Sequence, residues 1–249
     1  MNSLPAPMGR ILENFNEELL RWNKQINLIS RQDSGDRLAG LINQCLGGHE
    51  AVRAWLEESN LLAEASGGVC YFDLGSGGGL PGVVWHAMLN SWCEHVHTHL
   101  VEPREKRAWF LRRLNRIAEM PGFGVLQGRW GEVLVEEPGF PGGDPRVLLV
   151  SLKALHLDDN SVLRGLEAAF ASSSLDLTGK LVLLARYYPP EQLYDQELVS
   201  QLNIPEPGGI SAQGDYIYKA TGGEVLGLGP SGAGLASLVL STYEVQAGR

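Results

Sequence analysis

One segment, from Tyr71 to Gly82, constrains the fold of this chain more than any other. It reads Tyr-Phe-Asp-Leu-Gly-Ser-Gly-Gly-Gly-Leu-Pro-Gly, so that an apolar run with an acid, Asp73, near its end leads through a glycine cluster into a helix candidate. Glycines allow the positive φ values of a tight turn, and without a Cβ the backbone can approach a bound nucleoside closely. Pro81 suits the first turn of a helix, where its missing N–H costs nothing. The segment therefore predicts a strand, a ligand-binding loop and a helix.

The pattern on either side of this loop predicts a parallel sheet. Short apolar runs alternate with longer amphipathic stretches, which is typical of βαβ units. The expected strands are residues 69–74, 96–101, 123–126, 146–150 and 181–185. The expected helices are residues 81–89, 104–118, 161–170 and 190–202. Two further strand candidates, 216–219 and 235–245, have only a glycine-rich segment between them and predict an antiparallel pair at one edge.

A helical head precedes this alternating body. From Ile11 to Ile26 apolar residues recur every three or four positions, which predicts an amphipathic helix, and further helices are expected at 36–45 and 50–62. We therefore expect an N-terminal helical extension over residues 1–65 and a Rossmann-like α/β domain over residues 66–249. A mostly parallel sheet with a C-terminal antiparallel hairpin is the outline that most S-adenosylmethionine-dependent methyltransferases share.

Composition excludes several classes of protein. With 249 residues, 44% hydrophobic and 20% charged, the chain is neither disordered nor fibrous. No apolar run reaches the roughly 18 residues of a membrane-spanning helix, and the first residues do not resemble a secretory signal. Three scattered cysteines, Cys45, Cys70 and Cys93, fit free thiols in a reducing compartment. We expect a cytoplasmic protein, and a monomer.

The charge is negative overall and positive in one place. A net charge of −9 argues against a protein that coats nucleic acid through bulk positive charge. The stretch from Arg104 to Arg116 contains one acid, Glu105, and six basic residues, Arg104, Lys106, Arg107, Arg112, Arg113 and Arg116. One face of the expected helix could attract phosphate. The alternative is a solvated surface whose arginines pair with acids elsewhere.

Two acids at strand ends bear on the identity of the nucleoside. The spacing Gly77-x-Gly79-x-x-Gly82 also fits a dinucleotide fingerprint, so the glycines alone do not separate NAD from S-adenosylmethionine. Glu102 ends the second strand, where a carboxylate can accept hydrogen bonds from ribose hydroxyls, and Asp73 can help to hold a cationic amino-acid tail. Alternatively, the two carboxylates cap the turn and the helix that follow them. Loop, acids and hairpin together favour S-adenosylmethionine.

Four segments carry a more specific resemblance. They are Leu20-Arg-Trp-Asn-Lys-Gln-Ile-Asn-Leu28, the loop from Asp73 to Gly82, Leu100-Val-Glu-Pro-Arg-Glu-Lys-Arg-Ala-Trp-Phe-Leu111 and Gln127-Gly-Arg-Trp-Gly-Glu132. Together, over about residues 11–150, the chain resembles the ribosomal RNA small subunit methyltransferase G family (RsmG or GidB). The resemblance implies methylation of N7 of one guanine in bacterial small-subunit (16S) ribosomal RNA, with S-adenosylmethionine bound on a Rossmann-like sheet.

The resemblance also implies site residues. Leu80 matches a loop position that lines the cofactor, and Trp130 falls where the family contacts the adenine end. A tryptophan there could stack on adenine, or it could be a core residue. From the loop and the resemblance together, the expected cofactor-binding residues are Asp73, Gly75, Ser76, Gly77, Gly79, Leu80, Glu102, Trp130 and Gly131.

On the substrate side the chain departs from the family pattern. The family's His-x-x-Asp-Ser appears as Leu41-Ile-Asn-Gln-Cys45, and its Ser-Arg-Ala at the end of the fourth strand appears as Ser151-Leu-Lys-Ala154. Lys153 is the candidate catalytic residue, although a lysine does not reproduce a bidentate arginine contact and Leu152 could point into the site instead. The candidate RNA-binding residues are Arg112, Arg113, Arg116, Lys153 and Arg186.

Methylation of guanine N7 does not need general acid–base catalysis, because this atom carries a free lone pair and loses no proton. Accordingly, no Asn/Asp-Pro-Pro-Tyr follows the fourth strand and no cysteine lies near the ends of strands four or five. The alternatives are a non-catalytic adapter that binds S-adenosylmethionine and a methyltransferase of a small molecule or protein. His95, His97 and His99 share one face of a strand, but they lack a neighbouring ligand at metal-site spacing, and we expect no metal.

Overall fold

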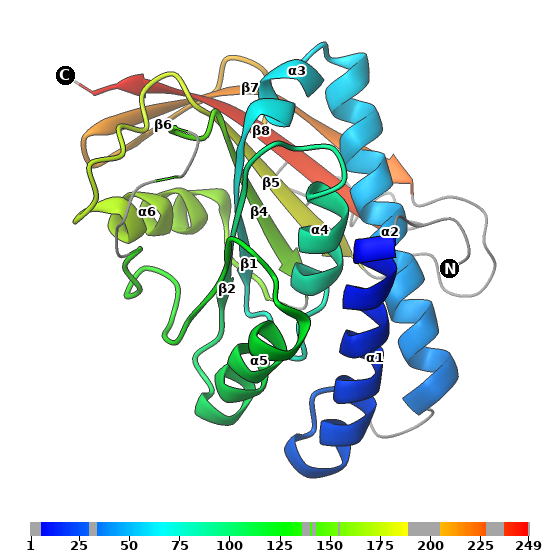
Figure 1. Ribbon diagram of the computed structural model, residues 1–249. Coiled ribbons are helices and arrows are strands. Elements are labelled where there is room, and N and C mark those ends of the chain that lie inside the picture. Colours follow the sequence, from blue (N-terminus) through cyan, green and yellow to red (C-terminus); the bar gives the residue numbers. More distant parts are fainter. Residues whose placement is uncertain are drawn as a thin grey trace.

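The computed structural model describes residues 6–29, 34–135, 140, 143–153, 155–188, 205–227 and 237–248. These residues form one sheet with helices on both faces (Figure 1). The helices are α1 (Ala6–Ile26), α2 (Ser34–Glu58), α3 (Leu62–Gly67), α4 (Gly82–Leu89), α5 (Glu105–Ala118) and α6 (Asp159–Phe170). The strands are β1 (Val69–Leu74), β2 (Val96–Val101), β3 (Phe123–Leu126), β4 (Val147–Lys153), β5 (Leu181–Tyr188), β6 (Ile210–Gln213), β7 (Tyr216–Gly227) and β8 (Ser237–Ala247).

The strands lie in the order β3-β2-β1-β4-β5-β8-β7-β6. The first five strands in this order, β3, β2, β1, β4 and β5, pair in parallel. Val69 of β1 lies opposite Val96 of β2 on one side and opposite Val147 of β4 on the other. β8 pairs antiparallel with both β5 and β7, and β6 pairs antiparallel with β7. The predicted Rossmann-like arrangement with its C-terminal antiparallel hairpin is confirmed. The direction of winding changes between β1 and β4, and ligands of such sheets bind at the carboxyl ends of these strands.

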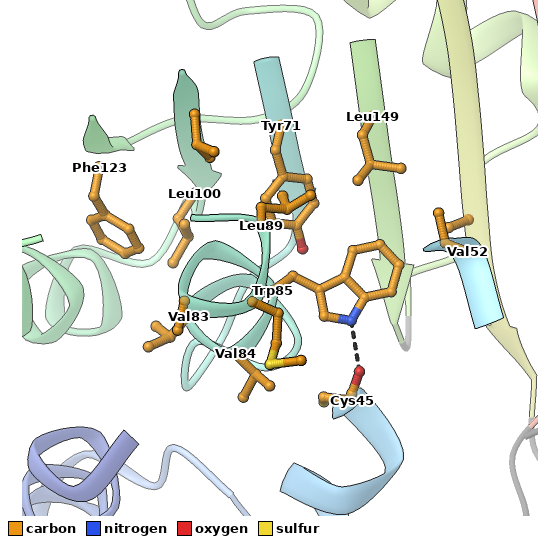
Figure 2. Packing of buried hydrophobic residues seen from close by; sticks show 14 of the residues in the cluster. Cys45, Val52, Tyr71, Val83, Val84, Trp85, Leu89, Leu100, Phe123 and Leu149 are labelled. Carbon is orange, nitrogen blue, oxygen red and sulfur yellow. Dashed lines mark hydrogen bonds between the residues drawn. The ribbon is translucent and has the colours of Figure 1, made fainter. Parts of the chain in front are cut away.

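Alternating side chains of the central strands build two hydrophobic clusters. Tyr71 of β1 belongs to the cluster under α1, α2, α4 and α5, whereas Cys70 and Phe72 belong to the cluster under α6. Figure 2 shows part of the first cluster, in which Trp85 of α4 lies beside Tyr71 and donates a hydrogen bond of 2.8 Å to the carbonyl oxygen of Cys45 in α2. Burial of both faces explains why these strands read as continuous apolar runs.

Most boundaries expected in the body are confirmed. β1, β2 and β3 match their predicted ranges, and α4, α5 and α6 begin within two residues of theirs. β4 and β5 each run three residues beyond their predicted ends, because the ladder between them continues to the pair of Lys153 and Tyr187. β6 has no counterpart in the prediction. The helix predicted over residues 190–202 lies outside the described part of the chain.

The head differs from the prediction at its second helix. Instead of separate helices over 36–45 and 50–62, the chain forms the single helix α2, which runs through Gly47 and Gly48. A Cβ on Gly48 would overlap the hydroxyl group of Tyr187 in β5. Glycine therefore does not end the helix here, because its role is to let the helix backbone approach the sheet closely.

The head and the sheet share one core. Phe15 of α1 and Ile42 of α2 are fully buried in the same cluster as Tyr71 of β1 and Trp85 of α4. The division at residues 65 and 66 stays a prediction drawn from the sequence, since the packing is continuous across it. In the described residues, no helix is long and apolar enough to cross a membrane.

Gly48→Ala tests the close approach of α2 to β5. The added methyl group must displace the buried Tyr187 ring, and overpacking of this kind lowers the free energy of unfolding by about 1 to 3 kcal/mol. Gly40→Ala is the matched control, because Gly40 lies in the same helix and a Cβ there meets nothing within 4 Å. Urea denaturation should show a loss for the first variant and a gain of about 0.5 to 1 kcal/mol for the second. Equal stabilities of the two variants would contradict the close approach.

Candidate functional site

The loop after β1 has the backbone conformation that its glycines predict. Gly77 and Gly79 have φ values of +56° and +93°, in the left-handed region that favours glycine. A Cβ on Gly79 would lie 2.9 Å from Val83 Cγ2 and 3.1 Å from Leu111 Cδ2. The amide groups of Gly75 and Ser76 donate hydrogen bonds of 2.9 and 3.1 Å to the carbonyl oxygen of Val101 at the end of β2, which fixes the loop at the carboxyl edge of the sheet.

The Asp73 carboxylate is buried and connects three elements. Its Oδ1 accepts a 2.6 Å hydrogen bond from Ser151 Oγ of β4, and its Oδ2 accepts a 3.2 Å bond from the amide of Gly82 at the start of α4. Ser151 has one hydroxyl proton and gives it to Asp73, so the Tyr71 hydroxyl, 2.8 Å away, donates to Ser151 Oγ. Burial raises the pKa of Asp73 to about 6, and the hydrogen bonds from Ser151, Ser76 and Gly82 limit the rise.

The hydrogen bonds of Asp73 agree with the alternative prediction, in which its carboxylate caps the turn and the helix that follow it. Ser76 Oγ also donates a 2.8 Å bond to the Asp73 carbonyl oxygen. A Cβ on Gly82 would lie 2.6 Å from Asp73 Oδ2, so the glycine allows the carboxylate to reach the helix N-terminus. A contact of Asp73 with a cofactor tail stays a prediction.

Glu102 connects the same loop to α5. Its Oε2 accepts a 2.8 Å hydrogen bond from the amide of Gly77, and its Oε1 accepts a 2.9 Å bond from the amide of Arg104. The side chain is 3% exposed. The helix-capping alternative therefore describes part of its role. Each carboxylate oxygen retains a second lone pair, so the predicted contact with ribose hydroxyls is compatible with these bonds.

The Trp-Asn-Lys-x-x-Asn-Leu segment of the head seats the end of α1 against the glycine loop. Asn23 Oδ1 accepts a 2.8 Å hydrogen bond from the amide of Ile29, and Asn27 adopts a left-handed conformation with φ +58°. The chain then turns so that a Cβ on Gly78 would lie 3.2 Å from the carbonyl oxygen of Leu28. Arg107 Nη2 of α5 donates a 3.1 Å bond to the Asn27 carbonyl oxygen. This segment contributed to the family resemblance of the sequence, but the sequence did not indicate that it supports the glycine loop.

Lys153 lies on the same face of the sheet as Asp73. Its Nζ is 3.8 Å from Cys45 Sγ of α2 and 5.4 Å from the centroid of the Tyr187 ring. Leu152 is buried in the cluster under α6, on the opposite face. Strand alternation thus turns Lys153 rather than Leu152 toward the Asp73 side. Burial raises the pKa of Cys45 to about 11, so this cysteine is a thiol at neutral pH.

Arg186 does not join Lys153. It points to the α6 face, where its Nη2 lies 2.5 Å from Asp159 Oδ1, and it is 8% exposed. The Tyr243 hydroxyl donates a hydrogen bond to the other carboxylate oxygen of Asp159. The arginine therefore connects β5 to the start of α6, and the RNA contact expected for it stays a prediction.

Trp130 packs as a structural residue. Its Nε1 donates a 3.1 Å hydrogen bond to the carbonyl oxygen of Val162 in α6, and its ring meets Phe72 edge to face at 5.3 Å. A Cβ on Gly165 would overlap the indole ring. These contacts fit the core alternative, and stacking on adenine stays a prediction. Gly131, the next residue, has φ +90° and open space at its Cβ position.

Some basic residues of α5 form ion pairs within the protein, and others are exposed to solvent. Arg113 Nε lies 2.9 Å from Glu18 Oε2 of α1, as the alternative of arginines paired with acids predicted. Arg112 is exposed, with Nη1 donating a 2.9 Å bond to Gln127 Oε1. Arg116 is also exposed. Of the three predicted RNA-binding arginines on α5, Arg112 and Arg116 thus remain open to solvent.

The histidines of β2 face the α6 side and contact aromatic rings. His99 stacks on Phe72 at 5.0 Å, and burial lowers its pKa to about 4. His97 meets Phe140 edge to face at 4.8 Å. Within the ranges that the structure describes, no group of three or more His, Cys, Asp or Glu side chains has a geometry that could hold a metal ion.

The sheet order and the loop at the carboxyl ends of β1 and β2 define a Rossmann-like domain of the methyltransferase type. A model of the GidB family, described as rRNA small subunit methyltransferase G, matches residues 8–139. The chain belongs to this family.

Known relatives carry the family's name. The chain is 35% identical over 148 residues to Ribosomal RNA small subunit methyltransferase G of Nitratidesulfovibrio vulgaris (strain DP4), a match that covers 59% of this chain and 60% of that protein. It is 35% identical over 128 residues to the protein of the same name from Bordetella pertussis (strain Tohama I), covering 51% and 52%. The matched part thus spans between half and two thirds of these relatives. Among solved structures, a putative O-methyltransferase from Klebsiella pneumoniae is 12% identical, with a TM-score of 0.46, over 96% of this chain and 90% of that chain.

Asp73→Asn tests the buried carboxylate. Because its pKa in the folded protein, about 6, is higher than the ordinary value of 3.8, the folded state binds the proton more tightly than the unfolded state. The stability of the wild type relative to Asp73→Asn should therefore fall as the pH rises from about 4 to 6, by about 2 to 3 kcal/mol.

Asp158→Asn is the control of opposite sign. The Ser161 amide holds the pKa of Asp158 below its ordinary value of 3.8, so the wild type should gain stability over this variant as the pH rises toward about 4, with no further change between pH 4 and 6. Urea denaturation at a series of pH values measures both differences. A relative stability of Asp73→Asn that does not change with pH would show that the Asp73 carboxylate is better solvated than its contacts indicate.

Proposed function

We propose that this chain transfers the methyl group of S-adenosylmethionine to N7 of a guanine in small-subunit ribosomal RNA. The observation that carries the proposal is the glycine loop at the carboxyl edge of the sheet, tied to its surroundings by Asp73 and Glu102, in a chain of this family. The partner would be the small ribosomal subunit, which also places the protein in the cytoplasm.

The residues present fit a nucleoside cofactor beside the loop. A Cβ on Gly77 would meet nothing closer than 3.6 Å, and one on Gly131 would meet nothing within 4 Å, so both backbones are open to a ligand. Gly75, Ser76 and Gly77 would offer backbone to the cofactor, with Leu80 beside them. Glu102 would accept hydrogen bonds from the ribose, and Trp130 and Gly131 would lie toward the adenine. When bound, S-adenosylmethionine supplies an electrophilic methyl group.

The chemistry asks mainly for positioning. Guanine N7 carries a lone pair and no proton, so the protein must hold this atom about 3 Å from the methyl carbon and in line with the sulfur, without a general base. Cys45 is protonated at neutral pH, because burial raises its pKa to about 11, and it is therefore unsuited to act as a nucleophile. Lys153 would place its positive charge near RNA phosphate or the cofactor's carboxylate.

Transfer of radiolabelled methyl groups from S-adenosylmethionine to small subunits tests the function directly. The subunits are taken from cells that lack this protein, so that the target position is unmodified, and subunits from wild-type cells serve as the control. Label should appear only in the ribosomal RNA of the first set. Binding of S-adenosylmethionine without transfer would favour a non-catalytic adapter, and labelling of a small molecule or protein in cell extract would favour a different methyltransferase.

Gly77→Val tests the cofactor assignment. The variant should lose binding of S-adenosylmethionine, because the side chain fills the space beside the loop and is strained at φ +56°. Gly179→Val is the matched control, since Gly179 also has positive φ, +75°, with nothing within 4 Å, and it precedes β5 at the other edge of the parallel strands. Calorimetry should show binding by the wild type and the control only. Tighter binding of NAD than of S-adenosylmethionine would remove the assignment.

Lys153→Ala tests the candidate catalytic position. Loss of a charge-assisted contact should lower the rate of methyl transfer about 10- to 150-fold. Lys219→Ala on the exposed side of β7 should leave the rate unchanged and serves as the control. A rate for Lys153→Ala equal to that of the control would show that Lys153 contacts neither RNA nor cofactor, with thermal unfolding recorded to separate misfolding from a specific loss.

A further inference from the structure

An exposed tryptophan stands in the middle of the basic face of α5. Trp109 is 40% exposed, although large aromatic side chains are usually covered. Lys106, Arg112 and Arg116 are exposed too, and with Trp109 they recur every three or four residues along the helix. Residues at this spacing share one face of a helix. Three positive side chains therefore flank one open indole ring.

The indole ring of Trp109 is held in place from beneath. It meets the ring of Trp22 in α1 edge to face, with centroids 4.8 Å apart and planes at 72°. Trp22 is itself fixed, because its Nε1 donates a 3.0 Å hydrogen bond to Glu18 Oε2 and the Arg113 guanidinium lies 5.5 Å from its ring centroid. The exposed ring is therefore supported by an ordered layer of side chains from two helices, and a ligand would not need to order it.

The acids nearby leave the face positive. Glu18 is engaged by Arg113 at 2.9 Å and by Arg21 at 3.3 Å, so it cancels charge that lies beneath and beside the tryptophan pair. Glu105, the first residue of α5, and Glu119, which directly follows the helix, are exposed acids. Lys106, Arg112 and Arg116 outnumber these two acids. A chain with a net charge of −9 thus presents a cationic surface here.

The position of α5 relates this face to the glycine loop. The helix begins at Glu105, just after Glu102, whose carboxylate accepts hydrogen bonds from the amides of both Gly77 and Arg104. α1 lies against α5 at the same end of the molecule (Figure 1). A nucleic acid lying on the α5 face would therefore extend from the edge of the sheet where the cofactor is proposed to bind.

We infer that Trp109 is a stacking platform for an unpaired base of an RNA, with Lys106, Arg112 and Arg116 contacting the phosphates on either side. This inference rests on the proposed function and names the form of RNA that the protein binds. Exposed aromatic rings among basic residues bind single strands, because every unpaired base offers a flat face and each phosphate a negative charge. A duplex keeps its base faces covered.

The test compares three variants of the full chain with the wild type. Trp109→Ala removes the ring, Trp109→Phe keeps an aromatic face, and Ile117→Ala is the matched control, because Ile117 is on the same helix and is 39% exposed. The probes are single-stranded oligoadenylate of twelve nucleotides and a duplex of the same length with oligouridylate, with affinity measured by fluorescence anisotropy of a labelled strand. Trp109→Ala should bind the single strand at least about fivefold more weakly. Trp109→Phe should stay within about threefold and Ile117→Ala within about twofold of the wild type.

A second measurement does not depend on the alanine variant folding well. Stacking of a base on an indole ring quenches its fluorescence, so the single strand should quench the wild type more strongly than Trp109→Phe. The double variant Arg112→Ala with Arg116→Ala should flatten the dependence of log affinity on log salt by about 1.4, since each phosphate contact with a single strand contributes about 0.7.

Equal weakening by Trp109→Ala and Ile117→Ala, equal losses with single strand and duplex, or quenching unchanged in Trp109→Phe would each overturn the inference. Oligoadenylate binding needs neither cofactor nor methyl transfer. Failure of the stacking site alone would therefore leave label transfer to small subunits intact, whereas failure of the proposed function would abolish label transfer in the wild type and leave the oligoadenylate result as measured.

Discussion

A single buried carboxylate organises the carboxyl edge of the sheet. Asp73 accepts hydrogen bonds from β4 through Ser151 and from the first amide of α4 through Gly82, while its own backbone carbonyl accepts one from Ser76 in the loop. Burial raises the pKa of Asp73 to about 6, so the charge is costly and depends on these donors. Asp73 therefore connects β1 to β4, to the loop and to α4, while Val101 and Glu102 accept the hydrogen bonds that fix the rest of the loop.

The second support of the loop comes from the head. Leu28 lies against Gly78, and Phe15 lies close to Gly79, so the N-terminal helix forms one wall of the glycine loop. Arg107 of α5 donates to the carbonyl oxygen of Asn27 at the same turn. The helical extension is therefore part of the site. α1 also carries Trp22, which supports the exposed ring of Trp109, so one helix contacts both the loop and the basic face.

The basic side chains of α5 stand out in a chain that is otherwise acidic. The net charge of the chain is negative. On α5, Arg113 forms an ion pair with Glu18, whereas Arg112 and Arg116 are exposed to solvent. An acidic protein with one cationic face binds polyanions in a limited orientation, since the rest of its surface repels them. For the proposed methyl transfer, which depends mainly on positioning, such orientation would contribute directly to the rate.

The amino-acid sequence by itself determined the parts of this protein that are local. β1, its loop and α4 follow from an apolar run, glycines that need positive φ and a proline at a helix start, and the order of elements follows from the alternation of apolar runs. The motifs of the head, the loop and α5 were also sufficient for the family. Each of these features depends on residues close together in the chain.

Only the tertiary structure decided the features that depend on distant partners. The sequence predicted separate helices over 36–45 and 50–62, but α2 continues through Gly47 and Gly48, and Tyr187 of β5 occupies the space that a side chain on Gly48 would need. The hydrogen bond from Trp130 to Val162 and the ion pair of Arg186 with Asp159 depend in the same way on α6, which is distant in the chain. A sequence pattern records which face of an element is apolar, whereas the partner of a polar group is set by packing between segments far apart in the chain.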